Sequence, residues 1–230
     1  MAAPLVDSAI ERMRQLITLG EWRSGDRLPS EAELSLQLGV SRSSTREAVR
    51  ALIAARVLDV RRGDGTYVTS LEPKLLLEAM SFVVALHEDT SILELFEVRR
   101  ILEPAAAALA TRRCQPADIE RLVEMLDEVD IGTSVEDLVA HDLKFHGFIN
   151  DLSGNSYLSS LLDSLSSHTL RARIWRGLTE EGSVARTLAE HRAIAEAMAS
   201  ADTELVRSCV SVHISGVERW LAKAAGSADG

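Results

Sequence analysis

Two short helices joined by a tight turn near the N-terminus restrict the fold more than any other pattern in this sequence. Ser30 and Glu33 have the spacing of a capping box, in which each side chain binds a free backbone N–H at a helix start. Gly39 ends this helix after a few residues, and Ser41 then caps a third helix that extends to about residue 55. Two short helices that meet at a steep angle across such a turn predict a helix-turn-helix.

A helix before this motif and a hairpin after it complete a small domain. Apolar residues recur at helical spacing over residues 5–19. Farther along, the β-rich runs at residues 57–60 and 66–69 flank a glycine-rich tip, which predicts a two-stranded wing. Three helices and a wing make a winged helix-turn-helix, which we assign to residues 1–72.

The remainder of the chain, residues 73–230, has the periodicity of amphipathic helices and no convincing strand. Pro104 falls inside one of these helices and predicts a kink or a break there. The expected fold is therefore mainly α, with the winged domain followed by an antiparallel all-α bundle of about six to seven helices. The expected helices of the bundle span residues 74–87, 91–112, 116–130, 135–152, 155–176, 184–200 and 202–224.

Charge is distributed unevenly between these two parts. Residues 1–72 are neutral overall, so the net charge of −10 belongs to the bundle. Within the neutral part, residues 40–62 hold six arginines against two acidic residues. A basic stripe on an acidic protein can bind a polyanion locally, although such a stripe alone is more often a solvated face.

Nothing in the sequence indicates export or membrane insertion. No uncharged apolar run approaches the ~20 residues that cross a bilayer. The N-terminus lacks the basic and apolar regions of a signal peptide, and two cysteines cannot make a disulfide framework. We therefore expect a cytoplasmic protein with no membrane partner.

The third helix carries the side chains expected to contact DNA. Arg42 and Arg46 are four residues apart and project from nearly the same face, where the first turns of a recognition helix reach base edges. Serines at the N-terminus of that helix suit phosphate oxygens. The predicted DNA contacts are Ser41, Arg42, Ser43, Ser44, Arg46, Arg50, Arg61, Arg62 and Gly63.

The bundle contains a candidate metal site. Asp142 and His146 are one turn apart on a single helix, and His191 and His213 come from two later helices. Three imidazoles and a carboxylate that converge in a bundle would hold a divalent transition metal with positions open for a ligand. Each of these residues alone is more often a packing or surface residue. Cys209 lies on the face of His213, but a buried cysteine is more often a small hydrophobe.

The motifs of the N-terminal domain resemble those of the GntR family of bacterial transcription regulators. The matching segments are Gly25-Asp26-Arg27-Leu28-Pro29-Ser30-Glu31, Leu38-Gly39-Val40-Ser41-Arg42, Arg46-Glu47-Ala48 and Arg61-Arg62-Gly63-Asp64-Gly65-Thr66-Tyr67-Val68. The resemblance implies operator contacts from Arg42, Ser43, Arg46, Arg62 and Gly63.

Two positions depart from the family pattern. Ala32 stands where the family often has arginine, which puts one DNA contact in doubt. Arg56 stands where the family usually has glycine, and a left-handed cap there costs a non-glycine residue about 1 kcal/mol.

The bundle resembles the ligand-binding domain of the FadR subfamily, known as FCD. The matching positions are Arg99, Glu103, Ala106, Asp142 to His146, Ser153-Gly154-Asn155, Glu190-His191 and Val212-His213-Ile214. In metal-containing members, Asp142, His146, His191 and His213 match the ligand positions, which argues against a fatty-acyl-CoA effector. The resemblance implies one divalent metal per subunit, zinc first, with nickel, manganese or iron as alternatives. It also implies a small carboxylate or sugar acid over the metal, held by Arg99, with Asn155, Arg171 and Arg173 as further candidates.

These patterns together predict a homodimeric transcription regulator, more often a repressor, that binds a pseudo-palindromic operator and responds to an acid. Two alternatives stay open. A pure metal sensor would carry the same four ligands, and so would a metalloenzyme that activates water. The absence of a motif-placed general base and the presence of the winged domain argue against the enzyme.

Overall fold

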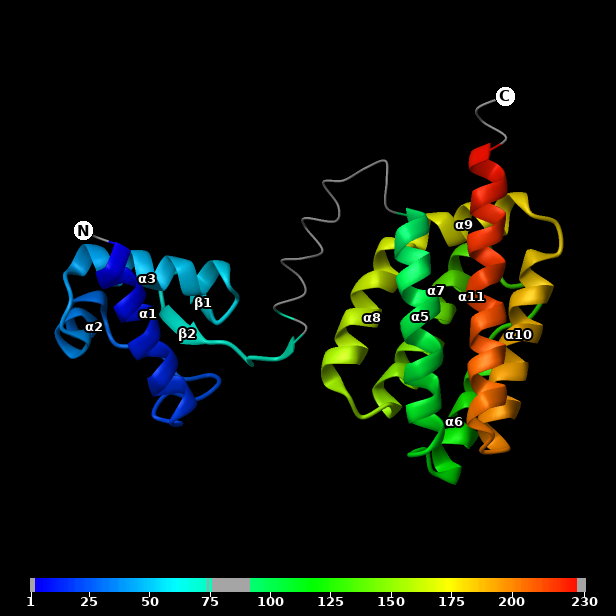
Figure 1. Ribbon diagram of the computed structural model, residues 1–230, viewed down its shortest axis with the longest axis horizontal. Coiled ribbons are helices and arrows are strands. Elements are labelled where there is room, and N and C mark those ends of the chain that lie inside the picture. The colour runs from blue at the N-terminus through cyan, green and yellow to red at the C-terminus, as the bar shows by residue number, and fades with distance from the viewer. Residues whose placement is uncertain (1–2, 74, 76–91, 227–230) are drawn as a thin grey trace. The chain divides into compact units, whose positions relative to one another are not determined.

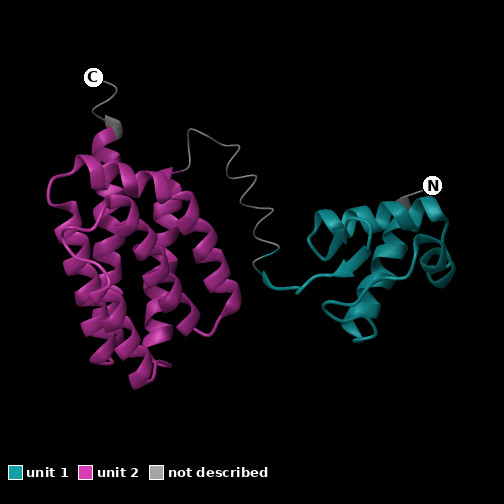
Figure 2. Ribbon diagram, turned by 180° about the vertical axis from the view of Figure 1, so that it is seen from behind, with its two compact units in different colours: residues 1–79 teal, residues 80–230 magenta. Residues whose placement is uncertain are grey.

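The computed structural model describes residues 3–73, 75 and 92–226 (Figure 1). The chain divides into two compact units, residues 1–79 and 80–230 (Figure 2). The boundary at residues 72 and 73 stays a prediction, and the expected helix at 74–87 lies outside the described residues. The mainly helical architecture with one small hairpin is confirmed.

The N-terminal unit is a winged helix-turn-helix. Its elements are α1 (Ala3–Thr18), α2 (Glu31–Leu38), α3 (Arg42–Ala54), β1 (Leu58–Arg61) and β2 (Gly65–Val68), and the two strands pair antiparallel. The Ser30–Glu33 capping box starts α2, and Gly39 ends it in the left-handed conformation. Met13, Leu34 and Leu58 are fully buried in a core that holds the helices and the wing together.

Arg56 adopts the left-handed conformation that the family resemblance implied for the end of α3. Its φ is 58°, a conformation that favours glycine. Its carbonyl accepts a hydrogen bond of 2.8 Å from the Thr69 hydroxyl just after the wing. The chain therefore keeps the turn between α3 and β1 despite the larger side chain.

The C-terminal unit is a bundle of helices. Its described helices are α5 (Ile92–Thr111), α6 (Pro116–Asp127), α7 (Val135–Leu152), α8 (Ser156–His168), α9 (Leu170–Thr179), α10 (Ser183–Ala199) and α11 (Thr203–Gly226). Helices α5 and α11 run side by side through the unit (Figure 1). Phe96, Phe145, Ile194 and Ile214 are buried in the apolar core. No helix in the described part of the chain is long and apolar enough to cross a membrane.

Two expectations about helix continuity differ from the structure. Of the kink or break expected at Pro104, the break does not occur, since α5 continues through it from Ile92 to Thr111. In contrast, the single helix expected over residues 155–176 is divided at Thr169 into α8 and α9. The Thr169 hydroxyl donates to the carbonyl of Ser166 at 3.0 Å, a local side-chain bond of the kind that competes with regular helix.

Candidate metal site and DNA-binding surface

Four buried side chains from three helices converge in the bundle. Helix α7 provides Asp142 and His146, α10 provides His191, and α11 provides His213. One potential ligand atom from each lies within 4.8 Å of all the others. The Asp142–His146 pair on α7 and the two later histidines thus lie together, as the sequence indicated.

The imidazoles surround one oxygen of the carboxylate. Asp142 Oδ1 lies 3.1 Å from Nε2 of His191, 3.5 Å from Nε2 of His213 and 3.8 Å from Nε2 of His146. Nε2 of His146 is buried and has no hydrogen-bond partner. An orphaned imidazole nitrogen beside two others and a carboxylate fits a divalent transition metal, since these are the ligands such ions prefer.

Two further carboxylates lie behind the histidines. Glu190 accepts a hydrogen bond of 2.9 Å from Nδ1 of His213, and Glu103 Oε2 lies 3.5 Å from Nδ1 of His146. A carboxylate on the outer ring nitrogen holds a histidine with its other nitrogen toward a metal. The FCD resemblance included both glutamates, but reasoning from the sequence assigned them no role.

The electrostatics of the cluster follow from burial and pairing. Burial alone disfavours the Asp142 carboxylate, but the charge of Arg173 and hydrogen bonds from His191 and His213 outweigh it and hold its pKa well below the ordinary value. Burial lowers the pKa of His146 and of His191, so both are neutral and able to bind a metal. Burial also disfavours charged His213, yet hydrogen bonds with Asp142 and Glu190 raise its pKa to about 9.

Two of the three arginines expected at the effector are buried, and the structure gives them different positions. Arg173 is buried, and its Nη1 forms an ion pair with Asp142. Arg99 is also buried, but it donates to Glu103 at 2.5 Å and to the Thr169 hydroxyl at 2.8 Å. Arg99 therefore supports Glu103 from behind the cluster instead of lining the pocket described next.

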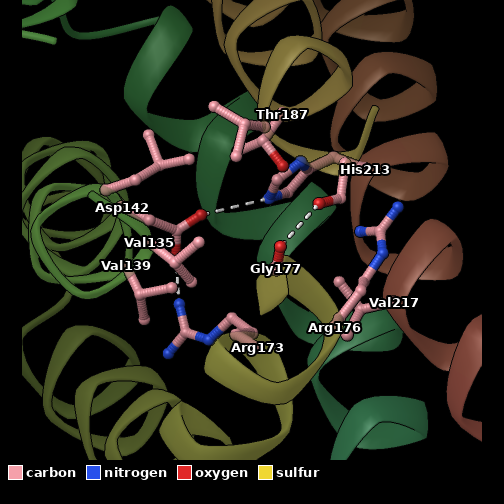
Figure 3. Close-up of a pocket in the computed structure, with 12 residues that line it drawn as sticks. Val135, Val139, Asp142, Arg173, Arg176, Gly177, Thr187, His213 and Val217 are labelled. Carbon is pink, nitrogen blue, oxygen red and sulfur yellow. Dashed lines mark hydrogen bonds and ion pairs between the residues drawn. The ribbon is translucent and has the colours of Figure 1, made fainter. Parts of the chain in front are cut away.

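A small pocket adjoins the cluster (Figure 3). Asp142, His213, Arg173 and Arg176 line it, and its other walls are largely aliphatic: Val135, Leu138, Val139, Val184 and Val217. The cavity volume is about 30 Å³, which is room for one or two water-sized groups. Sequence reasoning missed Arg176. The one signal that could have suggested it is its position one turn after Arg173 on α9.

Three other candidates do not reach this pocket. Arg171 is exposed on α9, because it is two residues from Arg173 and so lies on a different face of the helix. Asn155 is exposed and caps α8 by accepting a hydrogen bond from the Leu158 N–H at 3.1 Å. Cys209 packs against the apolar core, where burial raises the pKa of its thiol.

Most of the predicted DNA contacts lie on the surface of the N-terminal unit. The exposed members of that set are Ser41, Arg42, Ser43, Arg46, Arg50, Arg61, Arg62 and Gly63. Ser44 is the exception, because it is buried and its backbone N–H donates to the Ser41 hydroxyl at 3.1 Å. Ser44 thus belongs to the helix cap and is unavailable for DNA.

Arg46, one of the predicted DNA contacts, already has a partner within the motif. Its guanidinium donates to both oxygens of Glu31 at the start of α2, at 2.8 to 3.2 Å. Both side chains are about half exposed, so the pair is available to a ligand. On the wing, the guanidinium of Arg61 stacks over the Tyr67 ring at 4.1 Å.

Comparisons with known proteins agree with both units. The model of the bacterial regulatory proteins of the gntR family matches residues 5–68, and that of the FCD domain matches residues 94–216. The HTH-type transcriptional regulator LutR of Bacillus subtilis (strain 168) is 32% identical over 90% of this chain and 96% of LutR. The galactonate operon transcriptional repressor of Escherichia coli (strain K12) is 26% identical over 94% of this chain and 96% of the relative.

A third relative is the putative L-lactate dehydrogenase operon regulatory protein of Escherichia coli (strain K12), which is 28% identical over 95% of this chain and 87% of its own length. Among solved structures, a GntR protein of Streptococcus agalactiae aligns with a TM-score of 0.69 at 29% identity, covering 93% of this chain and 99% of that one.

A winged DNA-binding unit followed by a helical unit with a buried ligand cluster defines a class of two-part DNA-binding regulators. This chain belongs to the GntR family of bacterial regulatory proteins and carries an FCD domain of the FadR-like type. It is a transcriptional regulator, and the families it matches are those of regulators and not of enzymes.

Proposed function

We propose that this protein is a metal-dependent, acid-responsive transcription regulator and that it acts as a repressor. A divalent metal, zinc first, binds to Asp142, His146, His191 and His213, and a small carboxylate binds beside it in the pocket. Two copies related by a two-fold axis bind a pseudo-palindromic operator. The observation that carries this proposal is the buried four-residue cluster with a guanidinium at its edge.

The ligand set supports a metal that leaves room for a second ligand. Four protein donors leave positions open on an ion that takes five or six ligands, and there the metal would supply a positive charge that attracts a carboxylate. Arg173 adds a guanidinium, whose planar fork suits carboxylate oxygens. Arg173 and the four ligand residues are buried, so the attraction of this site for an anion is screened less than it would be at the surface.

The same acid must bind the DNA-bound and DNA-free states with different affinity. A coupling of about 1–3 kcal/mol is typical of allosteric proteins and is sufficient for regulation. The printed names of two relatives, for L-lactate dehydrogenase and galactonate operons, make hydroxy acids and sugar acids the first ligands to test.

The test uses the His146→Ala, His191→Ala double variant. Elemental analysis of the purified wild-type protein should give one metal per subunit, and the double variant should give none. DNA binding to the region upstream of the gene should respond to an acid in the wild type and not in the variant.

A matched control is His141→Ala, on the same helix. The ring of His141 bonds the Met125 carbonyl at 2.7 Å and lies outside the four-residue cluster. It should retain the metal. Retention of one metal per subunit by the double variant would refute the ligand set. DNA binding that follows free zinc and ignores every acid would favour the pure metal sensor.

A further inference from the structure

The walls of the pocket restrict which acid it can accept. Apart from the cluster and the arginines, the pocket is bounded mainly by the valines and the leucine named above, with Ser183 and Thr187 as the hydroxyl groups (Figure 3). The Ser183 hydroxyl already donates to the Gly177 carbonyl at 3.4 Å. Few polar groups therefore remain to pair with hydroxyls on a ligand.

The unpaired polar atoms at the pocket are donors. Nε of Arg173 and Nη2 of Arg176 are both buried without a hydrogen-bond partner. The charge of Arg173 is balanced by Asp142, and that of Arg176 by Glu180, whose carboxylate accepts from Arg176 Nε at 2.5 Å. Glu180 is not a proposed metal ligand, so Arg176 stays neutralised and its free N–H suits an uncharged oxygen. Asp142 would share its charge with the metal, so Arg173 keeps its attraction for a carboxylate.

The pocket is also closed on the side where α9 meets α7. A Cβ at Gly177 would overlap the side chain of Val135, so the two helices already lie in close contact there. With a cavity of about 30 Å³ any acid must displace the walls, and this close contact resists the displacement, so a short acid is favoured over a long one.

We infer that the effector is a short monocarboxylate of about two to four carbon atoms that carries one further oxygen, and not a polyhydroxylated sugar acid. The carboxylate lies at the metal and Arg173, the second oxygen accepts from Arg176 Nη2, and the carbon chain packs on Val135, Val139 and Val217. This inference rests on the proposed function and narrows its ligand class.

The expected selectivity follows from unpaired hydroxyls. A buried hydroxyl without a partner weakens binding by about 5- to 150-fold. A sugar acid brings several hydroxyls against aliphatic walls, so at least two of them remain unpaired. We therefore expect it to bind about 100-fold more weakly than a short hydroxy acid.

The experiment is isothermal titration calorimetry on the zinc-loaded, full-length protein with propanoate, 2-hydroxypropanoate, 2-oxopropanoate, gluconate and glucuronate. The three-carbon acids with a second oxygen should bind tightest, propanoate about 10-fold more weakly, and the two sugar acids weakest. Equal or tighter binding of either sugar acid would overturn this inference and leave the proposed function intact. If no acid binds or alters DNA binding, both are wrong.

Arg176→Gln tests the second contact. It should remove the preference for the oxygenated acids over propanoate. The affinity for every acid should also fall by a common factor, because the Glu180 charge loses the Arg176 guanidinium, so the ratio of affinities is the readout. Arg186→Gln is the matched control, because Arg186 also pairs with Glu180, at 3.0 Å, but is exposed and does not line the pocket. The control should keep the preference, and a preference that persists in Arg176→Gln as well would contradict the assignment.

A second variant keeps the inference testable if Arg176→Gln does not fold. Val139→Thr adds a hydroxyl to the aliphatic wall with little change in volume. It should narrow the difference between 2-hydroxypropanoate and gluconate, since a ligand hydroxyl then gains a partner. An unchanged ratio of the two affinities would show that this wall does not face the acid.

Discussion

Glu190→Ala tests whether the carboxylates behind the histidines belong to the metal site. Glu190 does not face the metal position, but it accepts a hydrogen bond of 2.9 Å from Nδ1 of His213. When the ring is neutral, as it must be to bind a metal, this bond keeps its proton on Nδ1 and leaves Nε2 turned to Asp142 Oδ1, at 3.5 Å. Without Glu190 the ring can rotate or carry its proton on the wrong nitrogen.

The expected loss follows from the number and length of these bonds. Removal of an outer carboxylate generally weakens metal binding by about 10- to 100-fold, or about 1.4–2.7 kcal/mol. We expect the upper part of this range for Glu190→Ala, because the bond is short and His213 is buried. We expect the lower part for Glu103→Ala, where the distance to His146 is 3.5 Å.

The assay is competition for zinc between the protein and a chromophoric chelator, with circular dichroism to check the fold. Glu190→Gln should fall between the wild type and Glu190→Ala, because the amide oxygen still accepts a hydrogen bond but carries no charge. Glu196→Ala, an exposed glutamate on the same helix, should bind zinc like the wild type. Wild-type affinity in Glu190→Ala, or an equal loss in Glu196→Ala, would refute the reasoning.

Four further outcomes are expected. Arg99→Ala leaves Glu103 as a buried, uncompensated charge, so urea denaturation should record a loss of about 3–5 kcal/mol; stability within 1 kcal/mol would contradict this. Gly154→Ala, at φ +67° beside Arg113, should cost about 1 kcal/mol or more in the same measurement, and no change would mean that the turn adapts. Arg46→Ala should weaken operator binding about 5- to 150-fold in a gel-shift titration and leave the bundle folded, whereas unchanged affinity would exclude a base contact. Glu31→Gln removes a negative charge beside Arg46, so it should strengthen binding to operator and unrelated DNA alike; a selective gain for the operator would count against this account.

The parts of this molecule that were predictable from the sequence are those set by local spacing. The capping box at Ser30, the helix end at Gly39 and the hairpin wing all depend on a few neighbouring residues, and all are present. The cluster of Asp142 and the three histidines could be predicted for a related reason. Asp142 and His146 lie on one helix face by their spacing alone, and the remaining ligands stood out as histidines in apolar patterns.

The sequence did not predict how several of the candidate site residues pack. Ser44 stands among the first residues of the recognition helix, but its side chain turns back to the cap at Ser41. The effector contact that the family resemblance implies for Arg99 stays a prediction, and the position of its guanidinium depends on Thr169, 70 residues away. Arg171 and Arg173 are the same residue type on the same helix. Only the packing of α9 decides that Arg173 is buried and Arg171 exposed. The contact of Ser44 is local and follows from the predicted cap, but no local pattern encodes the contacts of Arg99 or the burial of Arg173.

The break at Thr169 and the polarity of the pocket arise from one arrangement of side chains. Carbonyls near the end of a helix lack partners from a following turn and accept bonds from elsewhere. The Ser166 carbonyl near the end of α8 accepts from the Thr169 hydroxyl and from Arg173 Nη2, the latter at 2.5 Å. With Nη2 held there, Nη1 of Arg173 is directed at Asp142. Because Arg99 donates to the same Thr169 hydroxyl, the junction connects α5 with the carboxylate of the cluster. A continuous helix over residues 155–176 would have presented Arg173 on a different face, so the interruption that periodicity missed is what positions Arg173 beside Asp142.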